Sequence, residues 1–180
     1  MQVLKKEVYE AIEDNAIKLF KQFSYQGANI DIIAEKANIS TGNVYRYYKN
    51  KRAIYDRVTA KAYEMLDEAA DEILERKDVK IDELIEKIVD IYKKEKSSTI
   101  ILLGVKNTLN KELLEKYENI FVKTFKKGED DYLNEVYAKS IFYAFRVIID
   151  YEHSANKLND SLKKYMTNYW ENNRRTLKFC

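Results

Sequence analysis

Apolar residues recur at intervals of three and four along most of this chain, which is the spacing of one face of an α-helix. The first run lies between Val8 and Phe23 and has charged residues at the positions between. A longer run of the same kind extends from about 52 to 75. Beyond it, the pattern predicts helices at about 81–96, 98–109, 110–127, 130–152 and 156–176. We therefore predict an all-α protein.

Two short helices are predicted between the first helix and the long one. Asn29 can cap the first of them with its side-chain oxygen, and Asn38 suits the turn that follows, because asparagine tolerates the left-handed backbone conformation. Ser40 can cap the second, whose apolar side consists of Val44 and Tyr48. Its other sides carry Thr41, Gly42, Asn43, Tyr45, Arg46 and Tyr47. A helix this short cannot bury all its tyrosines.

Composition narrows the class of protein. The sequence has no proline and only four glycines, so the residues that punctuate sheets and long loops are nearly absent. With 34% charged and 46% hydrophobic residues, it resembles soluble globular proteins. The longest apolar run, residues 100–105, is far too short to cross a bilayer. We expect a cytoplasmic protein without a membrane partner.

Few residues are suited to catalysis or metal binding. Cys180 is the only cysteine and His153 the only histidine, which excludes an internal disulfide and a cysteine metal cluster. Carboxylates alone could serve an enzyme, but no paired-carboxylate pattern stands out. We expect no enzymatic activity, no cofactor and no metal site.

The two short helices and the turn between them are typical of a helix-turn-helix, whose second helix enters the major groove of DNA. Thr41 and Gly42 leave room for close approach of the backbone. Asn43 and Arg46 carry donors of the kind that read base edges, and tyrosine hydroxyls can contact phosphates. Residues 41–60 hold five basic and one acidic side chain, a local excess of +4 that favours a polyanionic partner.

The stretch IIAEKANISTGNVYRYYKNKRAI, residues 32–54, resembles the DNA-binding motif of the TetR family of bacterial transcriptional regulators. The positions in register with that motif are Ala34, Ala37, Ser40, Gly42, Tyr45, Tyr47 and Lys51. The chain departs from the motif at Asn38, where the family commonly has glycine, and at Tyr48, where it favours phenylalanine. It also has Ala28 and Asn29 near the family's usual threonine, and Asp31 and Ile32 in place of polar or basic residues.

The resemblance implies a helix-turn-helix DNA-binding domain at 1–50, with the start of the helix at 52–75, and a larger helical ligand-binding and dimerisation domain at 51–180. It also implies a homodimer, paired through helices at about 130–152 and 156–176, that binds double-stranded DNA at a palindromic operator. We expect a repressor that an unknown small-molecule effector releases. The expected DNA-binding residues are Asn29, Thr41, Gly42, Asn43, Tyr45, Arg46, Tyr47 and Lys51.

Two further questions stay open at the level of sequence. Tyr92, Phe121, Phe125, Phe142 and Arg146 are candidate ligand-binding residues of the larger domain. Aromatic residues at helical spacing also form ordinary core, and an arginine in an apolar helix can simply extend its head group to water or to an acidic partner. The alternative function is an all-helical interaction or scaffold protein without DNA binding.

Overall fold

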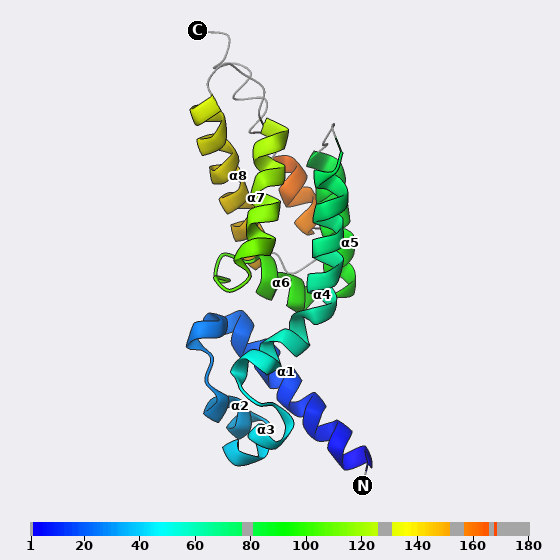
Figure 1. The fold of residues 1–180 in the computed structure, drawn as a ribbon, viewed down its shortest axis with the longest axis vertical. Helices are drawn as coiled ribbons and strands as arrows, with labels where there is room; N and C mark the ends of the chain where they lie inside the picture. Colours follow the sequence, from blue (N-terminus) through cyan, green and yellow to red (C-terminus); the bar gives the residue numbers. More distant parts are fainter. Residues whose placement is uncertain (1, 77–80, 126–130, 152–156, 166–167, 169–180) are drawn as a thin grey trace.

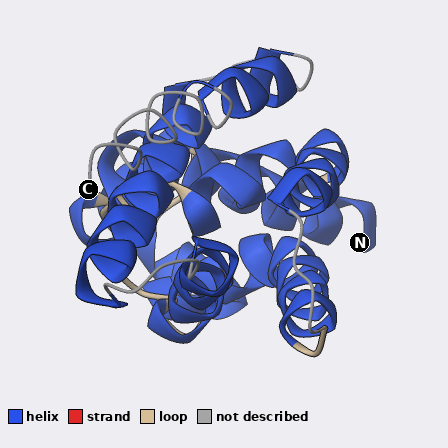
Figure 2. Cartoon of the chain, turned by 90° about the horizontal axis from the view of Figure 1, so that it is seen from above, coloured by secondary structure: helices blue, strands red, loops and turns tan. Residues whose placement is uncertain are grey.

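The computed structural model describes residues 2–76, 81–125, 131–151, 157–165 and 168. Its helices are α1 (Gln2–Gly27), α2 (Ile30–Lys36), α3 (Thr41–Tyr47), α4 (Lys51–Leu74), α5 (Ile81–Lys94), α6 (Lys96–Leu103), α7 (Lys111–Phe125) and α8 (Asp131–Tyr151). Residues 157–165 are helical as well. Helices make up the fold, and the described ranges contain no strand (Figure 1, Figure 2). The prediction of an all-α protein is confirmed.

The first helix begins earlier than its apolar pattern indicated but breaks where that pattern ends. Ser24 has φ 63° and ψ 178°, so the helix is interrupted directly after Phe23. A positive φ is uncommon in a residue other than glycine. The interruption starts the turn that leads into α2.

The ends of the two short helices form as the sequence predicts. The Asn29 side chain accepts a hydrogen bond from the Asp31 amide at 2.9 Å, and Ser40 Oγ accepts one from the Asn43 amide at 3.1 Å. Asn38 has φ 56°, the left-handed conformation expected between the helices. These local bonds set where α2 and α3 begin.

The long helix α4 passes through two separate clusters of buried residues. Ile54 and Tyr55 belong to a cluster shared with α1, α2 and α3, whereas Ala62 and Leu66 belong to a larger one shared with α5 to α8. In Figure 1, α4 accordingly runs from the lower group of helices into the upper group. Met65 is only partly buried, whereas α4 buries its neighbour Leu66 fully.

Two side chains of α8 hold the turn that follows α6. The Arg146 guanidinium donates to the carbonyls of Leu103, Gly104 and Asn107 at 2.7 to 3.0 Å. Asp150 accepts a hydrogen bond from the Val105 amide at 3.0 Å. Burial lowers the pKa of Arg146 and raises that of Asp150 from their ordinary values.

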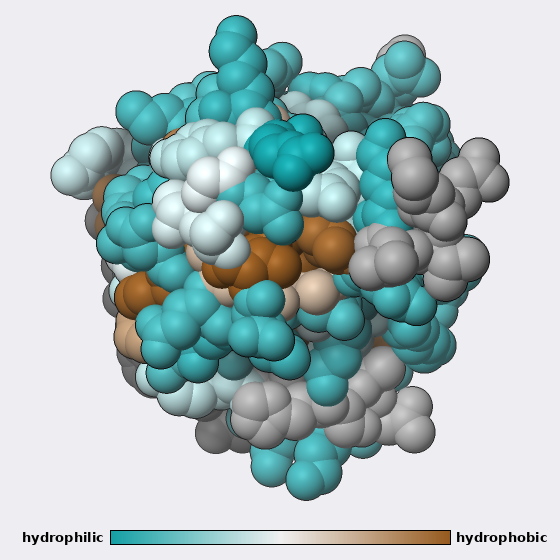
Figure 3. All heavy atoms as spheres, turned by 90° about the horizontal axis from the view of Figure 1, so that it is seen from below, coloured by the Kyte–Doolittle hydropathy of each residue, from teal (hydrophilic) through white to brown (hydrophobic). Residues whose placement is uncertain are grey.

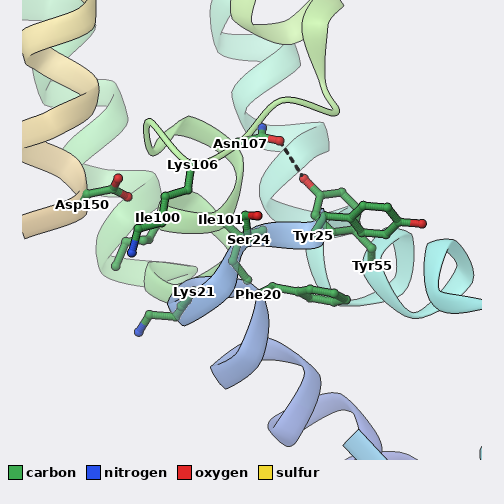
Figure 4. Close-up of a pocket in the computed structure, with 10 residues that line it drawn as sticks. All are labelled: Phe20, Lys21, Ser24, Tyr25, Tyr55, Ile100, Ile101, Lys106, Asn107 and Asp150. Atoms are coloured by element: carbon green, nitrogen blue, oxygen red, sulfur yellow. Dashed lines mark hydrogen bonds between the residues drawn. The ribbon is translucent and has the colours of Figure 1, made fainter. Parts of the chain in front are cut away.

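The same turn also contacts the N-terminal helices. The Tyr55 hydroxyl lies 2.6 Å from Asn110 Oδ1 and 3.4 Å from Asn107 Oδ1, and Gln26 donates to the Thr108 hydroxyl. Figure 4 shows the small pocket at this junction, with the rings of Tyr25 and Tyr55 on one side and Asp150 on the other. The turn thus joins α8 to α1 and α4.

The tight packing of this turn can be tested with Gly104→Ala. An added Cβ would lie 2.6 Å from the Ile100 carbonyl oxygen and against the Asp150 carboxylate, both closer than packed atoms allow. We expect the free energy of unfolding to fall by about 1–3 kcal/mol, measured by urea denaturation. Gly42→Ala is the control, since a Cβ there meets no atom within 4 Å. A loss of stability at Gly42 equal to that at Gly104 would contradict this packing.

Candidate nucleic-acid interface

Helix α3 lies at one end of the molecule with its back buried and its front exposed (Figure 1). Val44 is fully buried and Tyr48 is 8% exposed, as the apolar pattern predicted. Gly42, Tyr45 and Arg46 are exposed. The helix is therefore anchored by two side chains and presents its remaining ones to the solvent.

The anchor of α3 is a group of tyrosines against the first half of α1. The Tyr9 ring meets the rings of Tyr47 and Tyr48 edge-on, with centroids 4.7 and 5.6 Å apart. The Tyr48 hydroxyl donates to the Glu13 carboxylate, whose Oε1 lies 3.3 Å from Arg57 Nε. Burial and the Glu13 carboxylate together raise the pKa of Tyr48, so the phenol stays protonated and keeps this bond.

The three tyrosines of this segment have different environments. Tyr48 is buried, Tyr47 is half-buried with its ring fixed by Tyr9, and Tyr45 is 52% exposed. Tyr45 can therefore offer both its ring and its hydroxyl to a partner. For Tyr47, a phosphate contact through the hydroxyl stays a prediction.

The start of α3 is bonded to α2. The Thr41 hydroxyl donates to Asp31 Oδ1 at 2.8 Å, and the neighbouring Asn29 oxygen is engaged in capping α2. Sequence reasoning assigned Thr41 to DNA without finding this partner. Asp31 could have indicated this hydrogen bond, because it is an acidic residue where the TetR motif usually has a polar or basic one.

Lys51 has its hydrogen-bond partners within the chain. Its Nζ donates to the carbonyls of Tyr25 and Ala28 at 2.7 and 2.8 Å, lies 3.5 Å from that of Gln26, and stands 4.4 Å from the centroid of the Tyr25 ring. An ammonium has three hydrogens to donate, and these carbonyls can accept all of them. The expected phosphate contact of Lys51 stays a prediction; the structure gives this residue a second role, which is to hold the turn between α1 and α2.

The positive charge around α3 is partly neutralised by ion pairs. Arg52 pairs with Asp56 at 2.6 Å, and Arg57 pairs with Glu13. Arg46 and Lys49 are exposed and make no ion pair with the described residues. They are the cations of this segment best placed to meet a polyanion.

Seen from below, the end of the molecule that carries α2 and α3 has a mostly polar surface with a small apolar strip (Figure 3).

The candidate ligand-binding residues lie in the core of the larger helical group. Tyr92, Phe121 and Phe142 are buried, and the Phe121 ring centroid lies 5.3 Å from that of Phe142. The Phe125 side chain lies outside the described residues, and the Arg146 guanidinium is bonded to the turn after α6. A ligand-binding role stays a prediction for all five.

The described part of the chain contains neither a metal-binding cluster nor a membrane-spanning helix. There, no three His, Cys, Asp or Glu side chains are grouped so that they could hold a metal ion. None of the described helices has the length and hydropathy needed to span a membrane. His153 and Cys180 lie outside the described residues.

The N-terminal helices match a known protein family. Residues 12–58 match the model of the bacterial regulatory proteins of the tetR family. This segment contains most of α1, all of α2 and α3, and the start of α4. This N-terminal segment of the chain is therefore similar to the TetR family.

Two curated relatives are similar to this chain over its N-terminal part. The uncharacterized HTH-type transcriptional regulator YhgD of Bacillus subtilis is 34% identical over 71 residues, 39% of this chain and 35% of YhgD. IcaR of Staphylococcus aureus, named a negative transcriptional regulator of the biofilm operon icaADBC, is 38% identical over 48 residues, 27% of this chain and 26% of IcaR. The matches thus span about a third of the first relative and a quarter of the second.

Solved structures of TetR type resemble the fold over most of its length. SCO3833, a TetR-family member from Streptomyces coelicolor, covers 84% of this chain and 86% of its own, with a TM-score of 0.58 and 14% identity. NalD, a repressor from Pseudomonas aeruginosa, covers 91% and 95%, with a TM-score of 0.55 and 12% identity. The N-terminal helix-turn-helix and the C-terminal helical domain are therefore those of the TetR fold.

The role of Lys51 in holding the turn can be tested with Lys51→Met, which keeps the apolar stem and removes the ammonium. Loss of the carbonyl contacts is expected to lower the free energy of unfolding by about 1–3 kcal/mol, measured by urea denaturation. Lys49→Met removes an equal charge from an exposed position and is expected to change stability by less than about 0.5 kcal/mol. Equal stability of the two variants would show that the Lys51 ammonium contributes nothing to the turn.

Proposed function

We propose that this chain is a homodimeric, sequence-specific DNA-binding transcriptional regulator that acts on DNA in the cell interior. The observation that carries the proposal is the exposure of the front of α3, with Tyr45 and Arg46 facing solvent, while Val44 and Tyr48 lock its back. A helix fixed in this way can enter a major groove without being reshaped. The match of residues 12–58 to the TetR family supports the same function.

In this proposal the residues of α3 have different roles at the DNA. Asn43 and Arg46 read base edges, since both carry donors and Arg46 makes no ion pair within the part of the chain that the structure describes. Gly42 allows close approach, because the space in front of it is open. The complete proposed contact set is Asn29, Thr41, Gly42, Asn43, Tyr45, Arg46, Tyr47 and Lys51.

The proposed dimer interface is the outer face of α8, paired with the same face of a second copy and with residues from 156 onward. Tyr132, Val136 and Tyr143 are 75%, 45% and 60% exposed, and their spacing of four and seven residues places them on one side of the helix. A row of exposed apolar side chains on one side of a helix is typical of an interaction surface. Two copies related by a two-fold axis would present their α3 helices to successive major grooves of a palindromic operator.

Repression with release by a small molecule is the proposed mode of regulation. The naming of IcaR as a negative regulator supports repression for this chain. The effector would bind within the C-terminal helices, near Tyr92, Phe121, Phe125, Phe142 and Arg146. A ligand that displaced α8 would strain the turn held by Arg146 and Asp150, and that turn is bonded to Tyr55 of α4. The position of α3 would then depend on which state of α8 the ligand favours.

Selection of duplexes from a random library by the purified chain tests the proposal directly. We expect a palindrome to be recovered, bound with an affinity that falls steeply with salt, because each neutralised phosphate contributes about −0.9 to the slope of log K against log salt. Measuring the dissociation constants of the selected duplex and a scrambled duplex at several salt concentrations gives both the sequence preference and the salt dependence. Recovery of no duplex above background, or binding that is insensitive to salt, would instead favour a helical interaction protein.

Arg46→Gln and Arg52→Gln form a matched pair for this measurement. Both variants lose one positive charge, but Arg52 is already paired with Asp56. Arg46→Gln is expected to reduce discrimination between the selected and scrambled duplexes by about 1–3 kcal/mol, and Arg52→Gln to leave it nearly unchanged. Equal effects would show that Arg46 does not read bases.

The dimer can be tested with Tyr143→Glu, which places a charge in the exposed stripe of α8. We expect the wild-type chain to sediment as a dimer and the variant as a monomer, because an unpaired charge is costly in an apolar interface. Tyr45→Glu is the control: it places the same charge at an exposed tyrosine of α3, outside the proposed interface, and is expected to leave the dimer intact. A wild-type chain that is monomeric at micromolar concentration would contradict the proposed interface.

A further inference from the structure

Thr41, the first residue of α3, uses its hydroxyl hydrogen in a bond within the chain. Thr41 Oγ1 donates it to Asp31 Oδ1 on α2, at 2.8 Å. Asp31 is exposed, Thr41 is half-exposed, and the neighbouring Gly42 has open space in front of it. The pair therefore lies on the surface that the proposed function turns toward DNA.

The hydrogen bond changes what Thr41 can offer to a third group. A threonine hydroxyl has one hydrogen to donate and two lone pairs with which to accept, and an ionised carboxylate only accepts. With its hydrogen committed to Asp31, Thr41 can only accept from DNA. A phosphate oxygen is also only an acceptor, so this hydroxyl has no bond to make with it.

Major-groove base edges do contain suitable donors. Adenine presents its N6 amino group and cytosine its N4 amino group, whereas guanine and thymine present acceptors there. Thr41 Oγ1 and the carboxylate of Asp31 form two adjacent acceptors at the start of the reading helix. This arrangement matches one exocyclic amino group.

The negative charge of Asp31 also favours a base contact over a phosphate contact. A carboxylate at this surface repels phosphates, so a general attraction to the DNA backbone is weakened at this point. The position of Asp31 is also set locally, because its own amide donates to the Asn29 side chain that caps α2. Both effects favour base reading over backbone contact.

We propose that Asp31 and Thr41 form a specificity-determining pair that selects an adenine or cytosine amino group at one position of each operator half-site. The inference rests on the proposed function, because it assigns a role at the same DNA surface. It assigns a base contact to Thr41, which was expected only to contact DNA, and adds Asp31 to the reading residues.

Three variants separate the parts of this pair. Asp31→Asn removes the charge but keeps a side-chain oxygen that can accept the Thr41 hydrogen. Asp31→Ala removes the charge and the acceptor, which frees the hydroxyl hydrogen. Thr41→Val removes the hydroxyl and keeps the shape of the side chain. Glu35→Gln is the control, because it neutralises another exposed acidic residue of α2.

The experiment uses the selected duplex and copies of it that lack one amino group. At each position of a half-site, adenine is replaced by purine, or cytosine by pyrimidin-2-one, and the dissociation constant is measured for each protein. At one position, we expect removal of the amino group to weaken wild-type binding about three- to tenfold, the size of one hydrogen bond. Thr41→Val should show no such loss there, and Asp31→Ala a reduced one.

Asp31→Asn and Glu35→Gln should both keep the wild-type loss at that position. Asp31→Asn should in addition bind random duplexes about two- to fivefold more tightly at about 0.1 M salt, because one exposed repulsive charge has been removed. Thermal unfolding followed by circular dichroism verifies that each variant is folded.

The possible failures of the two proposals are distinguishable. If wild type and Thr41→Val lose the same factor at every position, the pair does not read an amino group and the inference is overturned, while the DNA-binding function stands. If the wild-type chain binds no duplex in a salt-sensitive way, the proposed function is overturned and the inference with it.

Discussion

Helix α3 has seven residues, and a helix of two turns is not stable in water without contacts from the rest of the protein. Its position depends on the burial of Val44 and Tyr48 against α1. Tyr9 packs edge-on against Tyr48, and Glu13 accepts the Tyr48 hydroxyl, so one face of α1 fixes the back of α3. Because the back is fixed, the front can be polar and exposed without loss of the helix.

The turn between α1 and α2 is the second element on which α3 depends. Ser24 interrupts α1 with a positive φ, and the carbonyls that follow converge on the Lys51 ammonium at the start of α4. Unpaired carbonyls at a helix end need a partner, and here a cation supplies it. Lys51 thereby joins α4 to the turn that sets the direction of α2. On the opposite side, Tyr55 of α4 reaches the turn that Arg146 and Asp150 hold.

The sequence was informative wherever structure is determined by near neighbours. The caps at Asn29 and Ser40 and the left-handed Asn38 were predicted, because each depends on a few adjacent residues. Most helices and the helix-turn-helix were predicted for the same reason, but the helix expected at about 98–109 ends at Leu103. The resemblance to the TetR family was found through the spacing of residues 32–54, and residues 12–58 match the family model.

Contacts between distant residues were not predictable in this way. The carbonyl partners of Lys51 lie more than twenty positions earlier in the chain, and those of Arg146 lie about forty earlier. Nothing in the pattern around either residue indicates those partners. The bond between Asp31 and Thr41 spans ten positions and two helices, so it too depends on how the turn places α2 against α3. These side chains have their roles from tertiary structure alone.

The central claim is that two copies of α3 face one DNA duplex together. It is tested most directly by the distance between spin labels at Lys49→Cys, two residues after the end of α3, in a chain with Cys180→Ser and bound to its selected duplex. Pulsed dipolar spectroscopy is predicted to give a narrow distribution near one helical turn of DNA, about 34–36 Å. Absence of dipolar coupling, or a broad distribution that a scrambled duplex leaves unchanged, would contradict the account.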